Sequence, residues 1–344
     1  MTTQSVDPVA AAEPTNTTRQ TATFGERLAD RLNPILVREI EQALAGRACV
    51  SILALSTFAV IGLGLMFAAR EREYGGQGRE AFEAVMVCLI PVATLFCPMQ
   101  SFQSTRQELS GGSAEQLSLT RMSNWQIVRG KALAGLAQFA IFASLFAPLL
   151  ALSYLLRGID LISIVLGLIT AAAFALVGNM LAVASATVGR GRVAVALIQF
   201  VCLASLITMS VIGVEFSSEL PRIAARLFSS APGESLEVVS SLAIAFHAML
   251  FFAILFGQVA AASLAHAHMN RSTGFRVLLF TAVGLYIGVL WLTEDPLERM
   301  FLLGGSFDTF LLLISPIWLV ACCEQSQMSR HVRLHVPRRK FLAV

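Results

Sequence analysis

Charged residues are scarce in this chain of 344 residues: Asp, Glu, Lys and Arg together account for only 14% of it. Soluble globular domains carry about 25% charged residues, so the composition argues against a soluble protein. Apolar residues reach 56% of the chain, and its mean hydropathy is +0.71. The shortage of charge therefore predicts a chain that lies in lipid over most of its length.

The residue patterns of common catalytic and metal sites are also missing. No phosphate-binding loop of the form G-x-x-x-x-G-K-[ST] exists, because Gly130-Lys131 is followed by Ala132 and lacks the earlier glycine. There is no H-E-x-x-H segment and no Ser-His or paired-carboxylate pattern of a membrane-bound hydrolase. The six cysteines lie in or beside apolar runs without metal-ligand spacing. We expect no enzymatic activity, cofactor or metal in the chain itself.

The apolar runs contain almost no charge. Ion-coupled secondary transporters need charged groups within the membrane, and here only Glu83 and Asp308 come close, both near the ends of runs. A lone histidine, His247, is more typical of a packed residue than of a proton relay. Other strong polar residues in the runs are candidates for hydrogen bonds between helices or, as the less favoured reading, for a substrate pathway: Gln138, Asn179, Gln199 and Gln258.

Apolar runs of membrane-spanning length dominate what is present. A helix needs roughly 20 mostly apolar residues to cross the bilayer core, and lipid offers no partners for unpaired backbone groups. The sequence therefore predicts an all-α, polytopic membrane protein with about eight transmembrane helices. The predicted spans are 49–69, 82–104, 132–156, 161–188, 193–213, 239–264, 276–292 and 307–323, of which the last two are short.

The distribution of basic residues predicts the orientation. With both termini in the cytoplasm, 18 of the 25 Lys and Arg residues fall on the cytoplasmic side and 7 on the outside. The positive-inside rule favours this topology over its mirror image. The formal net charge of +3 reflects the same bias, so we do not expect nucleic acid to bind.

An amphipathic helix precedes the first span. Residues 1–32 have the composition of a disordered tail, and an elbow helix follows at 33–47. Asn33 can cap this helix, and Pro34 suits its first position. Leu36 and Ile40 lie on an apolar stripe, whereas Arg38, Glu39, Glu41 and Gln42 occupy the other side. We expect it to lie on the cytoplasmic membrane surface. The alternative is a soluble cap on the cytoplasmic loops.

The remaining domain boundaries follow from the apolar runs. Residues 48–323 form the transmembrane domain, with a polar cytoplasmic loop at 105–131 and an outside segment at 214–238. Within the outside segment, helical spacing after Pro221 predicts a separate short helix at the membrane surface. Residues 324–344 form a basic cytoplasmic tail that can meet anionic lipid heads.

The loop between the second and third spans has its own helical signals. Ser113 can cap a short helix that carries Glu115, Leu117 and Leu119. A second helix is predicted to begin after Ser123 and to continue into the third span. A structured loop on one side of a membrane protein indicates contact with a partner there.

This loop resembles the segment that joins spans two and three in permease subunits of ABC transporters of the ABC-2 type. The family pattern E-x-x-x-G-T-x-E-x-L-x-x-T-P-L-S-x-x-x-I-x-x-G-K is matched at Glu108, Gly112-Ser113, Glu115, Leu117, Thr120, Met122-Ser123, Ile127 and Gly130-Lys131. The family's N-P-x-x-x-R-E start of the elbow helix is matched by Asn33-Pro34 and Arg38-Glu39. Arg121 and Ser113 depart from it, standing where proline and threonine are common.

The resemblance implies a membrane-spanning subunit that exports substrate with a separate cytoplasmic ATPase, which would hold ATP and Mg. It also implies a homodimer or heterodimer of permeases in a bacterial inner membrane. The implied ATPase-coupling residues are Glu108, Ser113, Glu115, Leu117, Leu119, Thr120 and Ser123. A non-transporting membrane scaffold, an ion-coupled secondary transporter and a membrane-bound hydrolase are the rival readings.

The predicted topology can be tested by single-cysteine labelling. In a background without the native cysteines, Glu115→Cys should react with a membrane-impermeant maleimide only after the cells are opened, because the basic bias places this loop inside. Reaction of residue 115 in intact cells would refute the orientation.

Overall fold

The computed structural model describes residues 34–70, 77–110, 123–188, 192–227 and 232–264, with four residues between 274 and 280. All regular structure in this part of the chain is helical, which confirms the predicted all-α class there. The elements are α2 (Pro34–Ala45), α3 (Arg47–Arg70), α4 (Gly78–Pro91), the π-helical turn η1 (Val92–Phe96), α5 (Cys97–Ser110), α7 (Asn124–Leu155), α8 (Leu161–Val188), α9 (Arg192–Leu227) and α10 (Pro232–Leu264).

Six stretches of the described residues are helical, long and apolar enough to cross a membrane: Arg47–Ala69, Gly78–Ser110, Asn124–Leu155, Leu161–Val188, Val193–Leu227 and Ser241–Leu264. They correspond to the first six predicted spans. The predicted spans at 276–292 and 307–323 fall outside the described residues, apart from 277, 278 and 280. Residues 1–33 and the tail at 324–344 also lie outside them.

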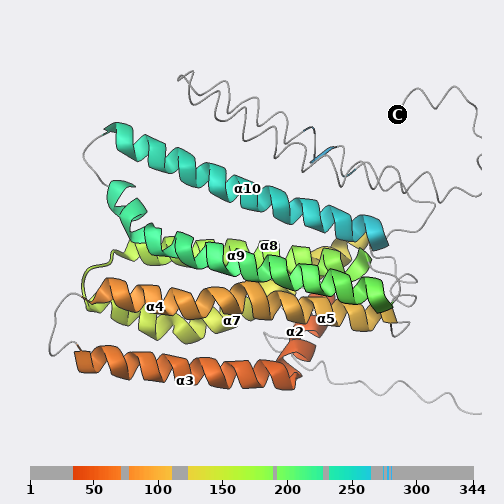
Figure 1. Cartoon of the computed structure of the whole chain (residues 1–344), viewed down its shortest axis with the longest axis horizontal. Helices are drawn as coiled ribbons and strands as arrows, with labels where there is room; N and C mark the ends of the chain where they lie inside the picture. The colour runs from red at the N-terminus through yellow and green to blue at the C-terminus, as the bar shows by residue number, and fades with distance from the viewer. Residues whose placement is uncertain are drawn as a thin grey trace, which may run out of the picture.

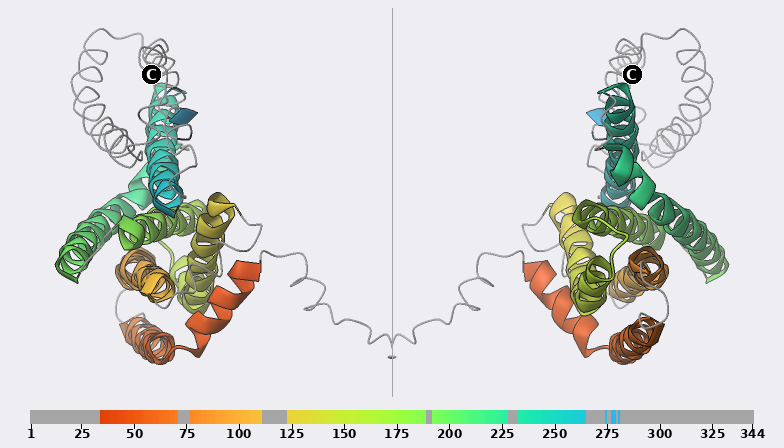
Figure 2. Two further views of the ribbon diagram at one scale, coloured as in Figure 1. Left: turned by 90° about the vertical axis from the view of Figure 1, so that its right-hand side faces the viewer. Right: turned by 90° about the vertical axis from the view of Figure 1, so that its left-hand side faces the viewer.

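The long helices follow one common direction, with α3 on one edge of the bundle and α10 on the opposite edge (Figure 1). The short helix α2 crosses this direction obliquely, as both end-on views show (Figure 2). We call the end where α5 finishes and α7 begins the loop end, and the end where α4 begins and α7 finishes the far end. α8 is central, since it contacts α5, α7, α9 and α10.

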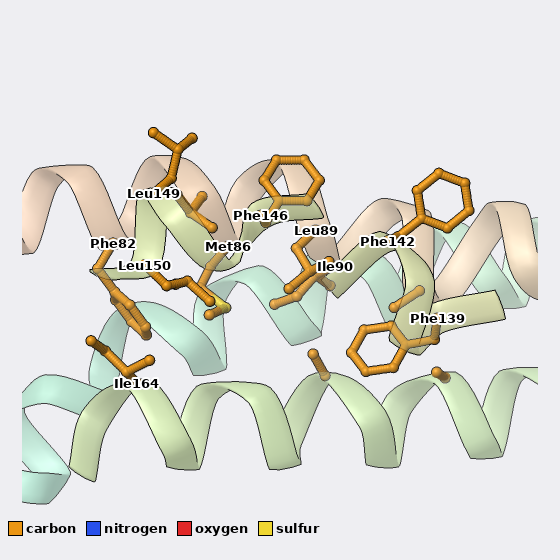
Figure 3. Close-up of a cluster of buried hydrophobic side chains, with 14 of the residues drawn as sticks. Phe82, Met86, Leu89, Ile90, Phe139, Phe142, Phe146, Leu149, Leu150 and Ile164 are labelled. Carbon is orange, nitrogen blue, oxygen red and sulfur yellow. The ribbon is translucent and has the colours of Figure 1, made fainter. Parts of the chain in front are cut away.

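Tight side-chain packing fills the space between α4, α7 and α8. Lipid is as apolar as a core side chain, so van der Waals packing and close helix approach must supply much of the stability. Gly167 on α8 permits such an approach, because a Cβ there would lie 2.9 Å from the Phe82 ring. Figure 3 shows the cluster, which includes Phe82, Met86, Leu89, Ile90, Phe139, Phe142, Phe146, Leu149, Leu150 and Ile164.

The short helix predicted after Pro221 is not a separate element. α9 continues through Pro221 to Leu227 as one helix. One proline removes only one backbone hydrogen bond. The core-facing stripe of α9 continues past that position, with Leu220 and Ala224 fully buried. Packing against the bundle therefore keeps the helix intact.

The far end is held by a backbone contact between α4 and α7. The Gly78 amide, at the start of α4, donates to the Arg157 carbonyl just beyond α7, at 2.9 Å. Arg157 and Gly158 have positive φ values of 61° and 97°, which turn the chain after α7. A Cβ on Gly78 would lie 2.3 Å from the Arg157 oxygen and 2.4 Å from the Ser153 oxygen. Only glycine fits this contact without displacing backbone.

Gly78→Ala should destabilise the bundle, because the added methyl group meets two backbone oxygens that cannot move independently. Overpacking of this kind costs about 1 to 3 kcal/mol. Gly62→Ala on α3 is the matched control, since a Cβ there meets nothing within 4 Å. Thermal unfolding in mild detergent should show a lower midpoint for Gly78→Ala alone; equal midpoints for both variants would contradict the contact.

Candidate functional site

The helix α2 presents a charged residue to the protein, contrary to the sequence prediction. It packs mainly on α7 and also touches α3. Leu36 is buried as its apolar stripe predicts, and Ile40 is half-buried. Glu39, which helical periodicity places on the charged side with Arg38 and Glu41, is buried. The reason is electrostatic: a buried carboxylate is tolerated when it is paired, and Glu39 is paired with a lysine on α7.

Five side chains from α2, α5 and α7 form what we call the ionic junction: Arg38, Glu39, Ser104, Glu108 and Lys131. The Lys131 ammonium contacts Glu39 Oε1 and lies 2.8 Å from Glu108 Oε2. It also donates to Ser104 Oγ at 3.2 Å, and Ser104 Oγ donates to Glu39 Oε2 at 2.6 Å. Arg38 donates to the other Glu108 oxygen.

Among the described residues, the ionic junction has equal numbers of acidic and basic side chains. Two carboxylates face one ammonium and one guanidinium. Three polar groups surround the ammonium, matching its three donors. The Lys131 side chain is only 3% exposed, whereas Arg38 is 46% exposed and borders solvent. Burying a charge is costly unless it is paired and hydrogen-bonded, and the arrangement meets both conditions for Lys131.

Further polar contacts fix the loop end of the bundle. Arg106 on α5 donates to the Ala186 carbonyl near the end of α8, at 3.0 Å. A positive charge at a helix C-terminus is favourable. α7 begins as predicted directly after Ser123, which forms a reciprocal capping box with Gln126. The stretch 111–122 thus connects α5 and α7, which contact each other through Glu108 and Lys131.

The structure describes two of the predicted coupling residues, and the other five lie outside the described residues. Glu108 lies in the last turn of α5 within the ionic junction, and Ser123 caps α7. The other predicted contacts, Ser113, Glu115, Leu117, Leu119 and Thr120, lie outside the described residues. On the elbow side, Asn33 also lies outside them, whereas Pro34 begins α2.

The four polar residues weighed for a pathway lie in different surroundings. The Asn179 side chain is fully buried; it accepts from Ser101 Oγ at 2.8 Å and donates to the Ala175 carbonyl at 2.8 Å. Gln138 is buried, and its amide oxygen has no partner among the described residues. Gln199 is exposed on α9, and Gln258 on α10 is half-buried. The structure does not gather these four residues into one site.

Sequence reasoning missed Ser104 and Lys131 as members of a site, and assigned Arg38, Glu39 and Glu108 to separate roles. A signal was present: Lys131 stands directly before an apolar run. A lysine that leads into the membrane needs an acidic partner nearby. The sequence does not show which of the acidic residues supplies it.

No group of three or more His, Cys, Asp or Glu side chains in the described part of the chain could hold a metal ion. The described polar contacts at the ionic junction join α2, α5 and α7.

Comparison with known proteins gives no relative: no family model, no curated protein and no solved structure matches this chain.

Replacing Lys131 should destabilise the bundle more than replacing a neighbouring cation. Lys131→Met leaves the buried Glu39 and the half-buried Glu108 without their shared partner, and breaking a buried pair costs about 3 to 5 kcal/mol. Arg129→Met is the matched control, because Arg129 is exposed on the same helix. Thermal unfolding in detergent should show a much larger decrease for Lys131→Met.

A double substitution tests whether pairing causes that decrease. Adding Glu39→Gln to Lys131→Met removes the negative charge of the buried carboxylate that has lost its ammonium partner, so the double variant should be less destabilised than the sum of its parts. Strict additivity would contradict a direct interaction between these two side chains.

Proposed function

We propose that this chain is the membrane-spanning permease subunit of an ABC-2-like transporter, driven by a separate ATP-binding subunit. The observation that supports it most is the ionic junction. Arg38-Glu39, Glu108 and Lys131 come from three separate parts of the sequence pattern on which the resemblance rests. In the structure these residues are in contact.

The arrangement suits the transfer of movement from a loop to the spans. Residues 111–122 leave α5 directly after the turn that carries Glu108 and return at the cap of α7. Because Lys131 ties both helices to α2, a force on the loop would act on all three helices together. A loop that only joined two spans would not need a buried lysine shared by two glutamates.

The remaining parts of the proposal follow from the resemblance. The chain would work in a bacterial inner membrane with both termini in the cytoplasm, as one of two permeases bound to two ATPase subunits. ATP and Mg would be held by the ATPase. The exposed apolar side chains of α3 and α9, such as Phe58, Leu65 and Phe200, suit contact with lipid or with the second permease.

The loop substitutions Leu117→Asp and Leu119→Asp test the proposed contact with an ATPase. Each places a charge in an apolar contact, which is strongly unfavourable when the charge is unpaired. The ATPase should therefore no longer co-purify with the permease in mild detergent, and transport should fall. Membrane abundance should stay near wild type, because both residues lie outside the predicted spans.

Leu155→Asp with Leu161→Asp is the matched control. Both leucines are exposed, at 72% and 61%; Leu155 ends α7 and Leu161 begins α8, so they lie at the far-end edges of two predicted spans. This variant should retain the ATPase. Equal recovery of ATPase with the loop variant and with wild type would contradict the coupling assignment.

A further inference from the structure

The second membrane span is not a uniform helix. It consists of α4, the π-helical turn η1 and α5. In η1 the Cys97 amide donates to the Val92 carbonyl, five residues earlier. Pro91 and Pro98 flank the turn, and each removes a backbone donor. π-helical turns inside α-helices are uncommon and frequently mark functional positions.

The two ends of this span are attached to different partners. At the far end, the Gly78 amide bonds the Arg157 carbonyl, and Arg79 lies 3.5 Å from the Ser218 carbonyl of α9. At the loop end, Glu108 and Ser104 belong to the ionic junction. Any difference in movement between the two ends must therefore be taken up between them, where η1 lies.

A close contact adjoins the turn on its loop side. The Pro98 ring packs against α8 at Gly178, where a Cβ would lie 2.9 Å from Pro98 Cγ. One turn further, Ser101 bonds Asn179, and a Cβ on Gly135 of α7 would lie 2.3 Å from the Asn179 side chain. Three helices thus meet tightly next to the position where the backbone hydrogen bonding of the span changes.

We propose that η1 is a hinge at which α5 bends relative to α4, with the Pro98–Gly178 contact as its support. α5 then follows the ionic junction while α4 stays attached to α7 and α9 at the far end. The Thr94 hydroxyl donates to the Ile90 carbonyl at 2.8 Å, which supplies a side-chain hydrogen bond where the backbone hydrogen-bond pattern changes. The role of this hinge in carrying loop movement to the far end rests on the proposed function; the hinge itself does not.

Hydrogen exchange measured by mass spectrometry on the full chain in lipid nanodiscs tests the hinge without an ATPase or substrate. The reference is residues 172–177 of α8, which lie level with η1 because Pro98 faces Gly178 and both helices run from the far end to the loop end. Amides of residues 92–97 should exchange faster than these by about tenfold, as expected for the loss of about one hydrogen bond. Equal exchange in the two segments would overturn the proposal.

Pro98→Ala restores an amide donor next to η1 and should slow exchange at 92–97 by about two- to tenfold. Pro148→Ala is the matched control, since Pro148 lies inside α7, which remains α-helical around it. It should leave exchange at 92–97 unchanged. Unchanged exchange in folded Pro98→Ala would overturn the hinge, and if this variant fails to fold, the wild-type comparison decides. The exchange test decides only whether the hinge exists, and the ATPase co-purification test decides only the proposed function, so either proposal can fail without the other.

Discussion

The buried ammonium of Lys131 sets the arrangement of the loop end. An ammonium out of water must have each of its donors satisfied and its charge balanced, and among the described residues Glu39 of α2 and Ser104 and Glu108 of α5 do both. The orientation of α2 follows, because Glu39 has to face α7. The last turn of α5 must also lie beside α7, because it carries Glu108, the second carboxylate that contacts Lys131.

The two ends of the bundle are held by interactions of different kinds. Charge and hydrogen bonds of side chains join the helices at the loop end, whereas a backbone contact at Gly78 joins α4 and α7 at the far end. Between them lie apolar side chains and a few small residues, such as Gly135 and Gly178, that let helices approach closely. The ion pairs that join α2, α5 and α7 thus lie at the end of the bundle where the polar loop is attached.

Much of the fold was predictable because lipid leaves a long apolar chain few alternatives to a helix. The start of α7 at Ser123 was predictable from local capping chemistry. Glu39 was not, because helical periodicity groups it with other charged residues, and a buried partner distant in sequence changes its environment. The continuation of α9 past Pro221 depends on tertiary packing of Leu220 and Ala224, which periodicity alone does not reveal.

The fixed ends of the stretch 111–122 limit how far it can extend. A fully extended chain spans about 3.4 Å per residue, so these residues, which must leave and return to neighbouring helices, can reach at most about 20 Å from the bundle. In helical form, at about 1.5 Å per residue, the reach falls to about 9 Å. Any protein that contacts this stretch must therefore come within about 20 Å of the ends of α5 and α7, where Arg38 also borders solvent.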